Sequence, residues 1–110
     1  MFKTIDVDFA KIASREDFHD LFSQVFGFPD FYGRNMHAWI DCMRSLRSPK
    51  DGLSKFALGE EEVLLLRMHG FSKFSQLEND FALNILYCIG VVNNFSVDSG
   101  TPPLISYSVD

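Results

Sequence analysis

One stretch decides the fold of this chain, and it reads Phe28-Pro29-Asp30-Phe31-Tyr32-Gly33-Arg34-Asn35-Met36-His37-Ala38-Trp39-Ile40-Asp41-Cys42-Met43. Pro29 fixes its own φ angle and favours extended backbone at Phe28. Gly33 supplies a turn conformation that other residues avoid. Asn35 is a strong N-cap residue. The stretch therefore predicts a stiff aromatic loop over residues 28–35, followed by a helix over residues 35–46.

The predicted helix is amphipathic. Its apolar side chains fall at i, i+3, i+4 and i+7, which is the spacing of one buried stripe: Met36, Trp39, Ile40 and Met43. Polar side chains occupy the other face: Arg34, His37, Asp41 and Arg44. A stiff aromatic loop beside a helix that points a carboxylate outward favours recognition of a partner over turnover of a substrate.

The rest of the chain alternates strand and helix patterns. Strands are predicted over residues 2–9, from Val63 up to Gly70, and over residues 104–109. A helix runs from the cap Ser14 to Gly27, with Asp17 as its capping-box partner, and a short helix or turn covers residues 71–77. Because each return to a strand passes through helix, we expect an α/β fold with a small parallel sheet and right-handed crossovers.

Two apolar segments lead to more specific expectations. The unbroken run Val63–Leu66 predicts a strand buried in a parallel sheet. A helix over residues 81–93, capped by Asn79 or Asp80, is apolar nearly all round. It is therefore expected to be buried on more than one side or to pack on another subunit. Residues 93–103 are predicted to form a loop.

Length and charge narrow the function classes. The chain has 110 residues, which suits one domain over residues 1–110. Its net charge of −5 argues against nucleic acid as the direct ligand, because phosphate binding needs clustered Lys and Arg. The same charge suits a basic protein partner that is drawn in electrostatically.

The chain offers no sign of export or of membrane insertion. Its first residues lack a charged-then-apolar signal pattern, and the apolar stretch 81–92, interrupted by Asn84, is short for a membrane span. Cys42 and Cys88 do not make a disulfide framework, and both lie in apolar helical patterns. We therefore expect a cytoplasmic protein.

The aromatic loop and the helix behind it resemble the signature of the barstar family, the intracellular inhibitors of the secreted ribonuclease barnase. The shared pattern is a Pro-acid-aromatic-Tyr-Gly-x-Asn loop and then a helix with a Trp and an Asp-Cys pair. The residues that match at the family's spacing are Tyr32-Gly33, Asn35, Ala38 and Asp41-Cys42. The close match covers about a fifth of the chain, and the order of elements extends it over all 110 residues.

The resemblance implies a three-stranded parallel sheet with helices around it. It also implies an immunity or inhibitor protein that binds a cognate toxin nuclease 1:1 and masks its active site. Asp41 occupies the position of the family's Asp that enters the enzyme's phosphate-binding site. The toxin-binding residues implied by the resemblance are Phe31, Gly33, Arg34, Asn35, His37, Ala38, Asp41, Arg44 and Ser45.

The chain departs from the family pattern at several of these positions. Phe31 lacks the hydroxyl of the family's Tyr, Arg34 stands for a loop acid, and His37 stands for a second interface Asp. The helix Trp and its aliphatic neighbour are exchanged in the pair 39–40, and residues 87–94 hold no acid in the last long helix. These differences predict a toxin other than barnase, one that is less basic or differently shaped.

Some residues have more than one interpretation. Of Phe31 and Tyr32, one is expected to pack on the protein's own core and one to contact the partner, with Tyr32 the structural one. His37 and Asp41, at i and i+4, form either a weak exposed pair or a pH-sensitive part of the interface. The sequence does not support a metal site, because no further ligands stand at a useful spacing. It does not support Cys42 as a nucleophile, because no His is placed beside it.

Other functions have less support from the sequence. An enzyme would need a nucleophile–base pair, a phosphate-binding Gly-rich loop or a metal set, and none stands out, so we expect no enzymatic activity and no cofactor. A non-inhibitory binding module of the same fold remains an alternative. So does a protein that self-associates through the 81–93 helix.

Overall fold

The computed structural model describes all residues from 1 to 110. Its elements run in the order β1 (Phe2–Asp8), η1 (Phe9–Lys11), α1 (Arg15–Phe26), α2 (Met36–Arg44), η2 (Pro49–Asp51), β2 (Val63–His69), α3 (Phe71–Leu77), α4 (Asn79–Asp98) and β3 (Ile105–Val109). The predicted α/β class and the order of its elements are confirmed.

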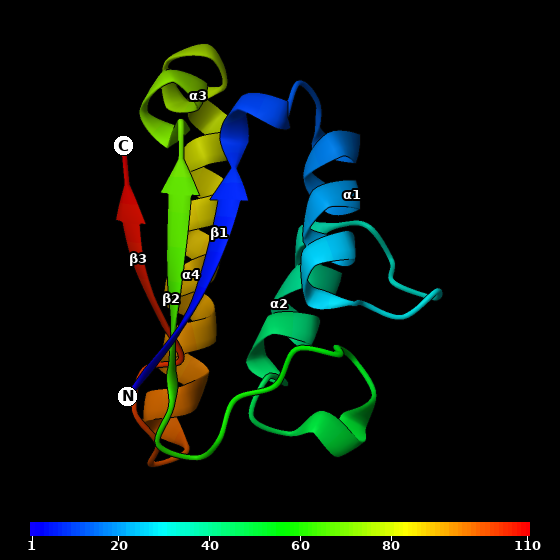
Figure 1. Cartoon of the computed structure of the whole chain (residues 1–110), viewed down its shortest axis with the longest axis vertical. Coiled ribbons are helices and arrows are strands. Elements are labelled where there is room, and N and C mark those ends of the chain that lie inside the picture. The colour runs from blue at the N-terminus through cyan, green and yellow to red at the C-terminus, as the bar shows by residue number, and fades with distance from the viewer.

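The three strands form one parallel sheet in the order β1-β2-β3. In the register, Ile5 of β1 lies opposite Leu66 of β2, and Leu66 lies opposite Tyr107 of β3. Helices α1 and α2 connect β1 to β2, and α3 and α4 connect β2 to β3. The long helix α4 runs behind the strands, and α1 and α2 lie beside β1 (Figure 1). The expectation of a three-stranded parallel sheet is therefore confirmed.

Only one face of the sheet is covered by helices. Leu64 and Leu66 of β2 are buried, whereas Arg67 between the buried positions is exposed. On the same outer face Thr4, Asp6 and Ser106 are also exposed. The predicted strand at the Val63–Leu66 run does lie in a parallel sheet, but it is buried on one face only, because Val63 and Leu65 face a side that no helix covers.

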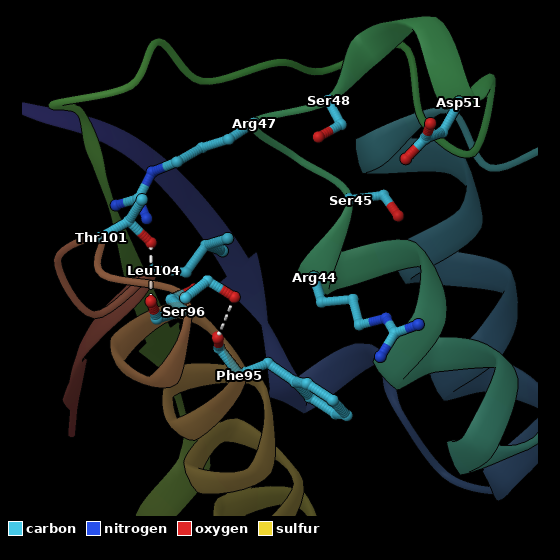
Figure 2. A pocket seen from close by; sticks show the side chains of 10 residues that line it. Arg44, Ser45, Arg47, Ser48, Asp51, Phe95, Ser96, Thr101 and Leu104 are labelled. Carbon is cyan, nitrogen blue, oxygen red and sulfur yellow. Dashed lines mark hydrogen bonds between the residues drawn. The ribbon is translucent and has the colours of Figure 1, made fainter.

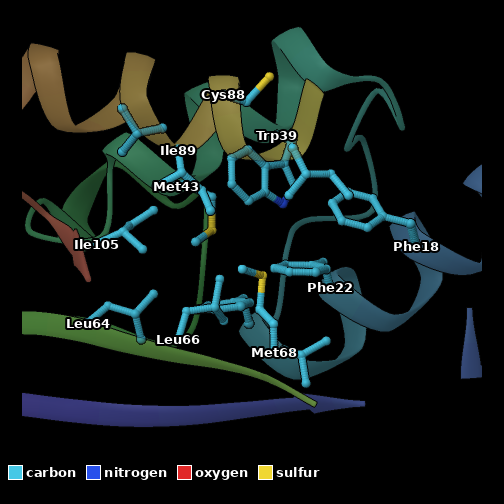
Figure 3. Close-up of a cluster of buried hydrophobic side chains, with 14 of the residues drawn as sticks. Phe18, Phe22, Trp39, Met43, Leu64, Leu66, Met68, Cys88, Ile89 and Ile105 are labelled. Atoms are coloured by element: carbon cyan, nitrogen blue, oxygen red, sulfur yellow. The ribbon is translucent and has the colours of Figure 1, made fainter. Parts of the chain in front are cut away.

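Aromatic side chains fill much of the core between the sheet and the helices (Figure 3). Phe18 and Phe22 of α1 pack against Trp39 of α2, with ring centroids 6.2 and 5.7 Å from the indole. Leu66 and Met68 rise from β2 below them. Because Trp39 is fully buried, α2 is fixed in rotation about its own axis.

Local signals set the ends of α1 as predicted. The Ser14 side chain accepts a hydrogen bond from the Asp17 backbone N–H, and Gly27 ends the helix with φ +70°. The Asp17 carboxylate accepts from the backbone N–H of Ala13 rather than that of Ser14, so the capping box is displaced by one residue. The chain then turns directly into the aromatic loop.

Helix α2 begins as predicted and ends early. The Asn35 side chain accepts from the Ala38 backbone N–H at 2.8 Å. The helix ends at Arg44, two residues before the predicted end at 46, because Ser45 and the residues after it form a turn. That turn still buries Leu46 in the core.

Helix α4 differs most from expectation. It runs to Asp98 rather than 93, and it begins after Glu78 without a side-chain cap, so the predicted loop 93–103 and the predicted capping residues are wrong. Asn93 lies within the helix and bonds to β3, accepting from the N–H groups of Leu104 and Ile105. Ser96, one turn later, is also buried and continues the buried stripe of α4.

By length and composition alone α4 could cross a membrane, since it has 20 residues and a window of mean hydropathy 1.3. This corrects the expectation that the segment is too short. In the fold α4 acts as a core helix on one side only, because side chains such as Ile85, Ile89 and Val92 are buried. Leu83 and Tyr87, by contrast, are exposed.

Alanine substitution at two glycines separates backbone strain from crowding. Gly27 and Gly52 have φ +70° and +72°, but only at Gly27 would a Cβ meet another atom, the Lys55 Cβ at 2.7 Å. We expect Gly52→Ala to cost about 1 kcal/mol of unfolding free energy from the left-handed backbone. Gly27→Ala should cost about 1–3 kcal/mol more because of overpacking. Urea denaturation of both variants measures the difference, and equal losses would contradict the crowding.

Candidate partner-binding site

The loop between α1 and α2 places two neighbouring aromatic rings in opposite environments. Phe31 is 76% exposed, whereas Tyr32 is buried. The Tyr32 ring packs 4.8 Å from that of Phe28, and its backbone N–H donates to the Pro29 carbonyl at 2.9 Å. The expectation that Tyr32 is structural is confirmed, and Phe31 is free to contact another molecule.

A buried hydrogen bond attaches this loop to α1. The Tyr32 hydroxyl lies 2.6 Å from Nδ1 of His19, and both side chains are buried. Burial raises the pKa of Tyr32, and Cys42 adds to that effect. Burial lowers the pKa of His19, and the positive charge of Arg34 lowers it further. A neutral imidazole that accepts from the phenol therefore suits the site.

Arg34 is a second attachment between the loop and α1. Its φ of +56° is the only positive value at a non-glycine residue. The left-handed turn therefore lies at Arg34, whereas the sequence predicts it at Gly33. Its guanidinium lies 2.9 Å from the Glu16 carboxylate and 2.8 Å from that of Asp20. Hydrogen bonds to these two carboxylates raise the pKa of Arg34. The side chain is thus directed at α1 of its own molecule.

Asp41 stands on the outer face of α2. Its side chain is 63% exposed and borders a small pocket of about 190 Å³ that Phe31, Gly33, Ala38 and others also line. Its nearest cation is Arg44, with Nε 3.8 Å from the carboxylate. The carboxylate is therefore exposed next to an exposed aromatic ring, where a cation from another molecule could approach it.

A second, more polar pocket of about 340 Å³ opens beside Arg44, between the carboxyl ends of α2 and α4 (Figure 2). The Arg44 guanidinium lies over the Phe95 ring of α4, 4.4 Å from its centroid. Ser45 lines the pocket, and its hydroxyl donates to the Asp41 carbonyl at 2.9 Å. Arg47 is occupied within the fold, because its guanidinium donates to the carbonyls of Glu62, Pro102 and Pro103.

The family model described as Barstar (barnase inhibitor) matches residues 2–107 of the 110. The chain belongs to the barstar family. A comparison with curated proteins gave no match. The match covers β1, β2, the beginning of β3, the aromatic loop and α2, so the resemblance seen in one short motif extends over nearly the whole fold. Members of this family are inhibitors that bind a ribonuclease, which supports a protein partner for this chain.

This barstar-family chain gathers most of its predicted site residues on one surface. Phe31, Gly33, Ala38 and Asp41 line one pocket, and Arg44 and Ser45 line the next. His37 is exposed one turn before Asp41 but forms no ion pair with it. Asn35 caps α2, and Arg34 contacts α1, so both fix the backbone of the site. Whether any of these residues touches a partner remains a prediction.

Cys42 and Trp39 lie beneath this surface. Burial raises the pKa of the Cys42 thiol to about 11, with a contribution from the neighbouring Asp41 charge. The thiol therefore stays protonated at neutral pH, and it lacks the activation that a nucleophile needs. Trp39 is fully buried, as its place on the apolar stripe predicts.

Three contributors to the site were missed on the sequence. Phe95 supports Arg44 from within the segment predicted to be a loop, and Thr101 closes the polar pocket through a bond to the Ser96 carbonyl. His19 binds Tyr32 across thirteen positions. Only the 3.6-residue periodicity could have extended the predicted helix to include Phe95, because Phe95, Ser96 and Val97 continue the pattern of the earlier turns.

Loss of the Tyr32 hydroxyl should destabilise the protein. Tyr32→Phe leaves the buried Nδ1 of His19 without a partner, which costs about 1–3 kcal/mol of unfolding free energy. Tyr87→Phe is the matched control, because Tyr87 is 70% exposed and forms no side-chain hydrogen bond, and its cost should stay within about 0.5 kcal/mol. Urea denaturation of both variants provides the measurement.

His19 should also give the fold a pH dependence. Its pKa lies below the ordinary value of 6.5, so over the range below 6.5 the unfolded chain binds more protons there than the folded chain. The unfolding free energy therefore falls as pH falls through this range. In His19→Gln, where the amide oxygen can still accept from Tyr32, this part of the decrease should vanish. Denaturation curves between about pH 7 and 5 test this, and parallel stability profiles would contradict it.

Proposed function

We propose that this barstar-family chain binds and masks the active site of a cognate ribonuclease-type toxin, with 1:1 stoichiometry. The binding surface consists of the loop 28–35 and the segment 35–46, and the protein acts in the cytoplasm of the cell that makes the toxin. The resemblance further suggests that the toxin is secreted. In this role the protein is an inhibitor and not an enzyme, and it needs no cofactor.

The exposed carboxylate of Asp41 is the observation that carries the proposal. It stands on a rigid helix whose rotation is fixed by buried Trp39, next to the exposed ring of Phe31. A carboxylate held in this way can take the place of a nucleic-acid phosphate in a basic active site. Because Tyr32 and Arg34 already hold the loop, little conformational entropy is lost when the surface is covered.

Charges near Asp41 support a partner that differs from barnase. Arg44 lies beside Asp41 and is supported by Phe95, so the surface presents one negative and one positive group side by side. A matching partner would offer a cation to Asp41 and a hydrogen-bond acceptor to Arg44. We expect barnase itself, whose cleft the family meets with several acids, to bind weakly.

Removal of the Asp41 carboxylate should weaken the complex strongly. If Asp41 is a central contact, Asp41→Ala raises the dissociation constant by about thirtyfold or more, equivalent to ~2 kcal/mol. Glu60→Ala is the matched control, because it changes the net charge equally at an exposed residue outside the proposed surface. Association and dissociation rates measured with the captured toxin separate local contact from long-range attraction. Equal effects of the two variants would remove Asp41 from the interface.

The toxin itself can be found by capture on the immobilised chain. An extract of the organism that carries the chain is passed over wild-type, Asp41→Ala and Glu60→Ala columns, and salt eluates are assayed for RNA cleavage. We expect ribonuclease activity from the wild-type and Glu60→Ala columns and much less from the Asp41→Ala column. Ribonuclease activity that is equal on all three columns, or absent from all, would count against the proposal.

One observation also favours self-association, whether in addition to inhibition or in a non-inhibitory binding module. Helix α4 exposes Leu83, Tyr87 and Val97 to solvent. The 81–93 helix was expected to be buried on more than one side, and this exposed face is what the monomer leaves uncovered.

A further inference from the structure

A cluster of charged side chains crosses the uncovered face of the sheet at the carboxyl ends of its strands. Asp6 and Arg67 lie opposite each other in the register of β1 and β2, and His69 comes two residues after Arg67 on the same face. Asp110 directly follows β3. In Figure 1 this end of the sheet lies beside α3, away from the loop 28–35 and α2.

His69 lies between two carboxylates of this cluster. Its Nε2 is 2.7 Å from Oδ1 of Asp6, and its Nδ1 is 3.2 Å from Oδ2 of Asp110. An ionised carboxylate only accepts hydrogen bonds, and a neutral imidazole has a single N–H, so only the imidazolium can donate to both. The geometry therefore fits the charged form of His69.

The charges around the ring also favour the imidazolium. The Nε of Arg67 lies 3.4 Å from the same oxygen of Asp6, so two cations and two carboxylates balance when His69 is charged. Asp8 lies opposite His69 in the register and adds a further carboxylate from β1. Hydrogen bonds to Asp6 and then to Asp110 raise the pKa of His69. The basic residues of the adjoining elements form no ion pair with the cluster: Lys11 of η1 and Lys73 of α3.

Asp110 is also bonded to the turn between β2 and α3. Its carboxylate accepts from the backbone N–H of Gly70 at 2.6 Å, and its backbone carbonyl accepts from the N–H of Ser72 at 2.7 Å. Both N–H groups lose these acceptors when Asp110 moves away. Their exchange with solvent therefore reports on the position of Asp110.

The end of β3 has few other attachments. Within the strand only Ile105, at its beginning, is buried, and the Asn93 side chain of α4 holds that end by accepting from the N–H groups of Leu104 and Ile105. The other end is exposed, and backbone bonds to β2 and the contacts of Asp110 hold it in place. Segments that bury little apolar surface open locally at low free-energy cost. A change at Asp110 therefore acts first on the end of β3.

We propose that His69, Asp6 and Asp110 form a pH-sensitive clamp that holds the end of β3 on the sheet. While His69 is charged, it links β1 to Asp110 across β2, and the clamp is closed. When the ring releases its proton to solvent, one nitrogen has no hydrogen to donate and presents a lone pair to a carboxylate. The longer contact, to Asp110, is the one that breaks, and the last residues of β3 then open away from β2.

The direction of this pH dependence follows from the pKa of His69. Because this pKa lies above the ordinary value of 6.5, the folded chain keeps the proton over a range in which the unfolded chain has released it. The clamp is therefore complete below pH 6.5 and is lost as pH rises through the folded pKa. His19 acts below pH 6.5 and in the opposite direction, so the two histidines can be distinguished.

Amide hydrogen exchange measured by NMR on the full chain tests the clamp without any partner. The clamp residues are partly exposed, so each contact is weak. We expect the protection factors of Gly70 and Ser72, corrected for the intrinsic effect of pH, to fall about two- to fivefold between about pH 6 and 9. The Leu104 amide, which bonds to Asn93 at the other end of β3, should keep its protection. Chemical shifts of the His69 ring over the same range give its pKa.

Substitutions identify the groups responsible. Asp6→Asn removes one of the two carboxylates and should lower the pKa of His69 towards 6.5. His69→Gln should make the protection of Gly70 and Ser72 independent of pH. Asp98→Asn is the matched control, because it removes one carboxylate from an exposed position at the opposite end of the molecule and should behave as wild type does.

Several outcomes would overturn the clamp. One is a His69 pKa at or below 6.5, and another is protection at Gly70 and Ser72 that stays constant over the pH range or falls equally in His69→Gln. A fall at Leu104 that matches the fall at Gly70 and Ser72 would show loss of the whole strand rather than opening of one end, which also contradicts the proposal. None of these measurements involves Asp41 or a toxin, so the clamp and the proposed function can fail independently.

Discussion

Burial of one indole ring determines which face of α2 is exposed to other molecules. Trp39 is the largest fully buried side chain, and it packs between α1 and the rest of the core (Figure 3). Residues 39 and 41 lie about 200° apart around a helix, so burying one turns the other outward. The exposure of Asp41 is therefore a consequence of hydrophobic packing. Even the indole N–H remains without a hydrogen-bond partner, which indicates that the packing of the ring outweighs the loss of that bond.

The features that could be predicted from the sequence are those encoded locally. Ser14, Gly27 and Asn35 set helix ends through contacts within four residues, and the stripe through Trp39 and Met43 follows from helical periodicity. Apolar runs and their order were enough to give the parallel sheet. Local signals gave a wrong prediction where a distant group decides the structure. Asn is common in loops, yet the side-chain amide of Asn93 bonds to the beginning of β3, and the helix continues through this residue.

The candidate site shows the same division. The outward direction of Asp41 and the burial of Tyr32 could be predicted, because each depends on its own helix or turn. The use of Arg34 could not, since its partners Glu16 and Asp20 lie more than a dozen positions earlier on α1. A residue that fills the position of a family contact acts here to hold the loop. The position of a residue in a motif predicts where its side chain leaves the backbone. Only the tertiary structure shows which groups its charge contacts.

Charge is divided unequally over the helices of the molecule. The α2 side carries Asp41 and Arg44, whose charges can select a partner, whereas the exposed face of α4 with Leu83, Tyr87 and Val97 is apolar. Charged groups give specificity because a wrong partner leaves them desolvated and unpaired. An uncharged surface selects poorly among apolar partners. The same core helix, α4, supports both: Phe95 on one flank holds Arg44 in place, while Leu83 and Tyr87 on another remain open to solvent.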